Sequence, residues 1–138
     1  MADDRKSSSI LKGSCACGGI RFEIRGPVVG INQCHCDKCR KETGTGSSTF
    51  IPVRAEQFTW ISGAELVVEP YTRCRVCGTL APDHNPNRAL YNVPAGLLDD
   101  DTGVKVAHHM FVSDKANWDV IGDGAPQYDE YGPPLIED

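Results

Sequence analysis

The chain has 138 residues, 40% of them hydrophobic, and a formal net charge of −5. This length fits one domain that can bury a core, and the acidic balance argues against a nucleic-acid partner. No segment approaches the ~18 apolar residues of a membrane span, so we expect no membrane partner. The polar start MADDRKSSS lacks the apolar core of a signal peptide, so we expect a cytoplasmic protein.

The predicted elements are mainly strands. We expect a flexible arm over 1–12, a single domain over 13–131 and a C-terminal tail over 132–138. Residues 20–25 alternate apolar and charged side chains, the period of a half-buried strand. Further strands are expected at 28–32, 48–53, 58–61, 65–68, 89–93 and 104–112.

One short helix is predicted at residues 37–43, with the sequence DKCRKET. Gly44 can end this helix because glycine tolerates the left-handed conformation. Elsewhere, frequent glycine and proline predict many turns, and short strands with many turns predict a mainly β domain. Exposed edges of small β domains favour pairing into a homo-oligomer, although the sequence does not fix the oligomeric state.

The seven cysteines are the strongest functional signal in the chain. In a reducing cytoplasm they are metal ligands rather than disulfides, and their odd number agrees with this. A thioredoxin-like motif requires a helix directly after its cysteines, and none is predicted after the third group. The cysteine spacings also differ from those of ferredoxin iron–sulfur motifs. The three groups are CACGG over 15–19, CHCDKC over 34–39 and CRVCG over 74–78.

The second and third groups predict two different kinds of zinc site. Cys74 and Cys77, followed by glycine, have the pattern of a zinc knuckle, which needs a partner pair to complete a closed structural site. Cys34, Cys36 and Cys39 can all reach one ion and leave a position open for water or a substrate. Three protein ligands and an open position are typical of catalytic zinc.

Spacing alone leaves the pairing of these groups open. In one arrangement the first and third groups share an ion and the second group binds another, which gives two zinc ions per chain. In the alternative, Cys39 joins the third group, and the other four cysteines share one ion: Cys15, Cys17, Cys34 and Cys36.

Basic residues beside the cysteines are candidate substrate contacts. Arg40 directly follows the last ligand of the open site, and Lys41 follows Arg40; these two are the candidates for binding an anionic substrate. Ordinary solvated charge explains most of the remaining basic residues near the clusters, which include Lys38, Arg73 and Arg75.

Histidines and tryptophans are expected to have mainly structural roles. His35 lies between two ligands, so alternation points its side chain away from the metal, where it is a candidate proton shuttle. The same alternation predicts that one of His108 and His109 faces inwards and the other outwards. Trp60 and Trp118 are expected to pack in the core or at its edge.

These motifs together resemble the glutathione-dependent formaldehyde-activating enzyme family of small zinc proteins. The resemblance covers residues 12–128, and the combined cysteine pattern is more specific than any single knuckle. The matching pieces are GSCACGG over 13–19, CHCDKCRK over 34–41 followed by Thr43-Gly44, CRVCGT over 74–79, and a weaker echo from His108 to Trp118 that ends in Asp123-Gly124 and Pro126.

The resemblance implies a β-tent fold of coiled antiparallel sheets held together by zinc. The implied reaction is that of a carbon–sulfur lyase acting in the addition direction, in which glutathione adds to formaldehyde and gives S-(hydroxymethyl)glutathione. Residues 71–73 depart from the family pattern and are expected to shape the substrate mouth. The implied ligands are Cys15, Cys17, Cys74 and Cys77 for a structural zinc, and Cys34, Cys36 and Cys39 for a catalytic zinc.

The residues support a mechanism in which zinc lowers the pKa of a bound substrate thiol, which then attacks an aldehyde carbon. A rival function is a family relative that acts on another thiol or electrophile. A second rival is a non-catalytic zinc-bound β domain that binds a protein. That second function needs only closed sites, so a fourth protein ligand at the second cluster, such as His35 or His84, would indicate it.

Overall fold

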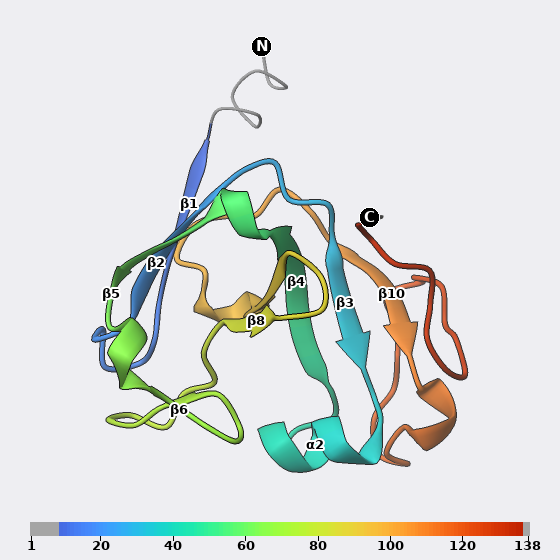
Figure 1. Ribbon diagram of the computed structural model, residues 1–138. Helices are drawn as coiled ribbons and strands as arrows, with labels where there is room; N and C mark the ends of the chain where they lie inside the picture. The colour runs from blue at the N-terminus through green and yellow to red at the C-terminus, as the bar shows by residue number, and fades with distance from the viewer. Residues whose placement is uncertain (1–8, 137–138) are drawn as a thin grey trace.

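The computed structural model describes residues 9–136, which form two main β-sheets, a short ribbon and one α-helix (Figure 1). The first sheet has the order β1 (Ile10–Ser14), β2 (Arg21–Arg25), β5 (Phe58–Ser62). The second has the order β10 (Val106–Met110), β3 (Ile31–Cys34), β4 (Ser48–Arg54), β9 (Leu90–Pro94), β8 (Asp83–Asn85). The remaining elements are the ribbon of β6 (Val67–Val68) and β7 (Arg73–Cys74), helix α2 (Asp37–Thr43), and single 3₁₀ turns at Ala55–Gln57, Ala64–Leu66, Ala95–Leu97 and Val112–Asp114.

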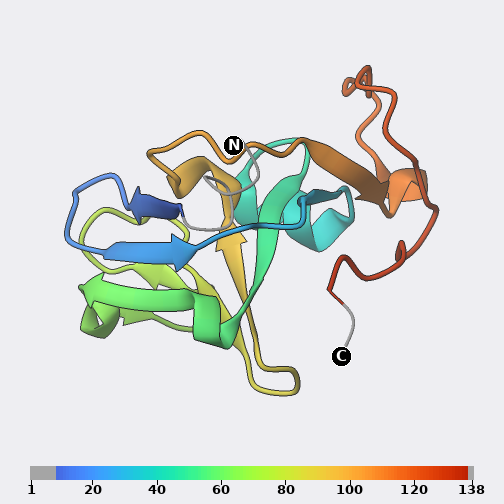
Figure 2. The same cartoon turned by 90° about the horizontal axis from the view of Figure 1, so that it is seen from above.

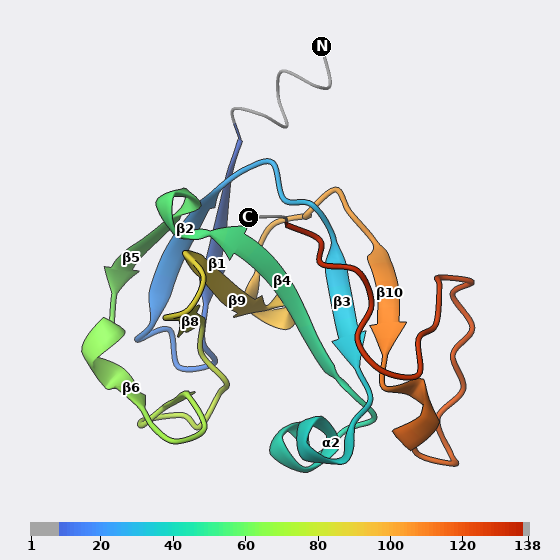
Figure 3. The same ribbon diagram turned by 45° about the vertical axis from the view of Figure 1, so that its right-hand side comes forward.

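The hydrophobic core joins the two main sheets. Strand β2 buries alternate side chains, as the period of its sequence predicts, and strand β4 runs beside β9 in the other sheet. Helix α2 lies below the second sheet, across from the ribbon of β6 and β7 (Figure 3). The fully buried core side chains include Ile20, Phe22, Ile24, Ile51, Val53 and Val93.

The mainly β fold with one short helix confirms the prediction from the sequence. The helix occupies Asp37–Thr43, and Gly44 ends it with a φ of 68° in the left-handed region. The strand pairs are mostly antiparallel, but β10 pairs with β3 in parallel. This departure arises because the long connection after β9 brings the chain back to the far side of β3 before β10 begins.

Both predicted chain ends contain ordered segments. Strand β1 begins at Ile10 and pairs with β2, so the last residues of the predicted 1–12 arm lie in the sheet; residues 1–8 are outside the described part. In the predicted tail, Ile136 is buried and its carbonyl accepts a hydrogen bond from Arg88 at 2.6 Å. Figure 2 shows the red C-terminal segment leading back from the region of the β10 arrowhead towards the C-terminus. Within residues 9–136, no helix is long and apolar enough to cross a membrane.

Gly63 holds the end of β5 against the turn that carries the first cysteines. Its φ is +81°, and a Cβ at this position would lie 2.2 Å from the Gly19 carbonyl oxygen and 2.7 Å from the Ile20 Cα. Such contacts force the backbone to move, and the left-handed conformation adds strain for any side chain. Glycine is therefore required here for the close approach of two backbones.

We expect Gly63→Ala to lower the free energy of unfolding by about 3 kcal/mol or more, because backbone must move and the new residue is strained. Gly96→Ala is the matched control, since nothing lies within 4 Å of its added Cβ. The control should change the free energy by less than about 1 kcal/mol. Urea unfolding followed by circular dichroism measures both. Equal stability of the two variants would contradict this view of Gly63.

Candidate functional site

The first and third cysteine groups come together as a four-sulfur cluster. Cys15 and Cys17 lie in the turn between β1 and β2, Cys74 ends β7, and Cys77 lies in the turn that follows. The four sulfur atoms all lie within 4.8 Å of one another. The structure therefore brings together the pairs that spacing alone left open, and this cluster could hold one metal ion.

Backbone geometry directs polar hydrogens at these sulfurs. The amide of Gly19 donates to the Cys17 sulfur at 3.4 Å, and the amide of Ile20 donates to the Cys15 sulfur at 3.3 Å. The Thr79 hydroxyl lies 3.1 Å from the Cys77 sulfur and is the main cause that lowers the pKa of this thiol to about 5. This hydrogen bond favours the thiolate form of Cys77, which is the form that binds metal.

The sulfur positions fit a tetrahedral zinc ion. Zinc–sulfur bonds of about 2.3 Å place tetrahedral sulfurs ~3.8 Å apart. The Cys15 and Cys17 sulfurs are 3.5 Å apart, and the Cys17 and Cys74 sulfurs are 3.9 Å apart. All seven cysteines are free thiols. The donor set therefore matches a closed four-thiolate site.

The second group forms a separate cluster of three sulfurs. Cys34 ends β3, Cys36 is the N-cap of α2, and Cys39 lies on the first turns of that helix. Their sulfurs lie within 4.8 Å of one another, and the Cys39 amide donates to the Cys36 sulfur at 3.4 Å. Within residues 9–136, no fourth Cys, His, Asp or Glu ligand atom joins this group. The cluster could hold an ion and leave a position open.

Hydrogen bonding lowers the pKa of one thiol in this cluster as well. The Cys34 thiol is the largest cause, with hydrogen bonds from Ser48 and Cys36 adding to it, and together they bring the pKa of Cys39 to about 6. The same hydrogen bond with Cys39, followed by burial, raises the pKa of Cys34. These hydrogen bonds favour the thiolate form of Cys39, which is the form that binds metal.

A pocket of about 250 Å³ lies between α2 and the loop before β7. Phe50 lines it and lies two residues after Ser48 on β4, so both side chains are on the face that carries the Cys34 sulfur. Tyr71 and Thr72, which were predicted to shape a substrate mouth, also line this pocket. An adjoining pocket of about 320 Å³ is lined by Lys38, Lys41, Glu42, Tyr71 and Arg73.

The two basic residues predicted to bind substrate lie in different places. Lys41 lines the adjoining pocket. Arg40 instead forms an ion pair with Asp37 one turn earlier on the helix, and it is not among the residues that line either pocket. This placement favours Lys41 over Arg40 as a contact for an anionic group.

A chain of hydrogen-bonded polar side chains runs from two buried histidines, His35 and His109, to the exposed Asp123. His35 Nε2 is 2.9 Å from His109 Nδ1, and His109 Nε2 is 2.8 Å from an Asp123 carboxylate oxygen. Because Asp123 accepts from His109 Nε2–H, a neutral His109 ring accepts from His35 at Nδ1. Burial, followed by the proximity of His109, lowers the pKa of His35. Of this chain, alternation along the sequence predicted only that His35 points away from the cysteines.

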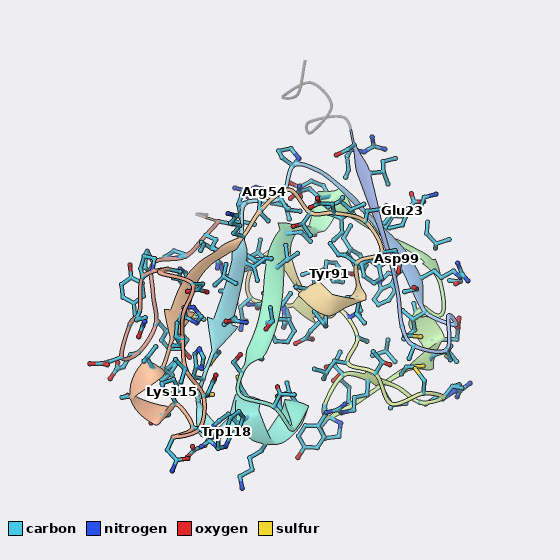
Figure 4. The ribbon with its side chains drawn as sticks, turned by 180° about the vertical axis from the view of Figure 1, so that it is seen from behind. Glu23, Arg54, Tyr91, Asp99, Lys115 and Trp118 are labelled. Atoms are coloured by element: carbon cyan, nitrogen blue, oxygen red, sulfur yellow. The ribbon has the colours of Figure 1, made fainter. Side chains whose placement is uncertain are left out.

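The hydrogen-bonded side chains of His35, His109 and Asp123 line a pocket of about 310 Å³, and no cysteine lines it. Its rim is formed by the loop after α2 and by residues 118–123, and a Cβ on Gly46 would lie 3.5 Å from the Trp118 ring. Figure 4 shows Trp118 beside α2, with Lys115 on the neighbouring turn. Trp118 is 68% exposed, so the expectation that it packs in the core or at its edge was wrong.

Both histidines of β10 are buried, which corrects the prediction that one faces outwards. Hydrogen bonds attach the C-terminal segment to β10: the His109 amide donates to the Pro126 carbonyl, and the Tyr128 amide donates to the His109 carbonyl, each at 2.9 Å. The Tyr128 ring packs edge-on against His108, with ring centres 5.7 Å apart. Alternation within one strand cannot predict a segment that covers its outer face.

We expect His109→Phe to lower the free energy of unfolding by about 2 kcal/mol, because it leaves the buried His35 without its hydrogen-bond partner. His84→Phe is the control, since His84 is exposed, and it should change the free energy by less than about 0.5 kcal/mol. Urea unfolding of the metal-loaded proteins measures both. Similar losses in the two variants would show that the buried contact contributes little.

Comparisons with known proteins agree with these features. A relative from Halomonas elongata, named "Putative glutathione-dependent formaldehyde-activating enzyme", is 27% identical in an alignment of 124 residues, and the match covers 79% of this chain and 79% of the relative. A crystal structure of a Rhodobacter sphaeroides protein matches with a TM-score of 0.54 and 20% identity over 69% of this chain and 98% of its own, so it shares the fold. The sequence profile of one family matches residues 10–114, which include both cysteine clusters. The chain therefore belongs to the glutathione-dependent formaldehyde-activating enzyme family.

Proposed function

We propose that this protein is a zinc-dependent carbon–sulfur lyase that adds a thiol such as glutathione to a small aldehyde such as formaldehyde. The observation that supports this most strongly is the three-sulfur cluster, which lacks a fourth protein ligand among the described residues. A purely structural site would be closed by a fourth ligand. The family and the name of the Halomonas elongata relative support the choice of glutathione and formaldehyde.

The proposed metal content is two zinc ions per chain. In this proposal Cys34, Cys36 and Cys39 hold the catalytic ion, and the four-sulfur cluster described above holds the structural ion. Zinc held by three thiolates supplies a position for a further ligand and lowers the pKa of a thiol that binds there. The three free thiols also support a location in a reducing compartment such as the cytoplasm.

In this proposal the substrate occupies the two pockets beside α2. Lys41, on the exposed side of α2, is positioned to meet a carboxylate of glutathione, which carries two. Phe50 and Tyr71 present apolar surface to the body of the substrate. Phe50 lies on the same face of the sheet as the Cys34 side chain, which belongs to the three-cysteine cluster. Holding thiol and aldehyde together converts a reaction between two molecules into a step within one complex.

The metal sites predict distinct responses to metal removal. Native protein should contain two zinc ions per chain, and Cys39→Ser should contain one, because two remaining thiolates hold zinc poorly. A chelator should remove the ion of the three-cysteine cluster first. Plasma emission spectroscopy before and after chelation measures this. Equal zinc content in the native protein and the variant would contradict the assignment of Cys39.

The activity is tested by exchange between labelled formaldehyde and its glutathione adduct, followed by NMR. Native protein should accelerate the exchange, and Cys36→Ser should lose at least ~100-fold of that acceleration, as expected when the metal's contribution of several kcal/mol is removed. Thr59→Ala on the exposed edge of β5 is the control and should behave as native. A protein with two bound zinc ions but no acceleration would contradict the lyase proposal and favour a protein-binding role.

A further inference from the structure

The guanidinium group of Arg73 donates hydrogen bonds to two segments that carry cluster cysteines. Nη1 donates to the Gly78 carbonyl at 2.8 Å, and Gly78 directly follows the cluster residue Cys77. Nη2 donates to the Glu42 carbonyl on the last turn of α2. Arg73 also directly precedes Cys74 in β7. One side chain therefore joins the turn of the four-cysteine cluster to the helix of the three-cysteine cluster.

Helix α2 depends on such contacts for its position. It has seven residues and buries none of them, whereas isolated helices shorter than about 12 residues are marginal in water. Its last carbonyls have no partner within the helix, and the negative end of the helix dipole favours a cation there. Arg73 meets both needs at Glu42, so it helps to fix the helix that presents Cys36 and Cys39.

The position of Arg73 depends in turn on the four-cysteine cluster. The Cys74 amide donates to the Thr79 carbonyl, and the Gly78 amide donates to the Cys74 carbonyl, each at 2.8 Å. Outside this turn, β7 pairs only with the two residues of β6 and with Leu80 among the described residues. A metal ion that binds Cys74 and Cys77 would hold this turn, and with it the guanidinium, in one arrangement.

We propose that Arg73 couples the two metal sites, so that an ion in the four-cysteine cluster increases the affinity of the three-cysteine cluster. Because coupling is reciprocal, an ion in the second cluster increases the affinity of the first by the same factor. The inference rests on the proposed metal sites but not on the proposed reaction. It also explains why Arg73, although it lines a pocket, is occupied by two carbonyls rather than free for substrate.

The test compares Arg73→Met with Arg75→Met, a matched control that removes the same charge from an exposed position in the same turn. Metal-free, reduced protein receives one equivalent of Zn²⁺ for the tighter site, and Co²⁺ is then titrated while its thiolate absorption bands are followed. Arg73→Met should weaken Co²⁺ binding by about 5- to 20-fold, and Arg75→Met by less than about twofold. Arg73→Lys should fall between them, because an ammonium group cannot reach both carbonyls as the planar fork does.

A second comparison separates coupling from a local effect on the turn. In a chain with Cys39→Ser, the three-cysteine site is removed, so Arg73→Met should affect the four-cysteine site no more than Arg75→Met does. In the chain with both sites, Arg73→Met should weaken that site. Equal weakening with and without Cys39 would overturn the proposal, as would equal Co²⁺ affinity in the two methionine variants. Native protein that binds one ion would contradict the proposed function and this inference together; two ions with no difference between variants would contradict only this inference.

Discussion

The four-cysteine cluster joins distant parts of the chain, and the arrangement of the turns around it depends on this contact. The Cys17 and Cys74 sulfurs are 57 residues apart in sequence and 3.9 Å apart in space. Bringing such segments together costs chain entropy, and four partly charged sulfurs at this spacing repel one another without a cation. Metal binding offsets both costs, so we expect the free energy of metal binding to contribute to folding. The cluster joins the turn between β1 and β2 to the turn after β7. It therefore also positions the ribbon of β6 and β7.

At the end of strand β3, a cysteine and a histidine point to opposite faces of the sheet. Cys34 points to the face of Ser48 and Phe50, and Phe50 lines the pocket between α2 and the loop before β7. The next residue, His35, points to the opposite face and meets His109 in a buried chain. The same alternation that makes a strand thus points the His35 side chain away from the three sulfurs that could hold a metal ion. Among residues 9–136, the three-cysteine cluster has no nearby fourth protein ligand.

Local features of the sequence predicted the local structure well. The helix at 37–43 and the strand at 20–25 depend on periodicity and on a glycine stop, which act over a few residues. Strand β1 was missed because Gly13 interrupts its pattern, yet Gly13 is needed: a Cβ there would lie 2.2 Å from the Phe22 ring. Strand β8 was missed because its polar sequence DHN belongs to an edge and gains its order from pairing with β9.

Long-range features of the site were beyond the sequence. Spacing could not decide which cysteine groups share an ion, because that depends on how two sheets pack. The burial of His108 and His109 depends on a segment that follows β10 and returns to cover it. The bridging role of Arg73 depends on two carbonyls, one of them 31 residues away, and backbone carbonyls carry no signal in the sequence.

Cadmium-113 NMR of the cadmium-substituted protein distinguishes an open three-cysteine site from a closed one, since the cadmium shift reports how many sulfurs bind each ion. We expect two resonances, one typical of four sulfurs and one typical of three sulfurs with a further lighter ligand. Only the second should move towards the four-sulfur position when glutathione is added. Two four-sulfur resonances in the free protein, or a second resonance that glutathione does not change, would contradict an open three-cysteine site that takes a substrate thiol.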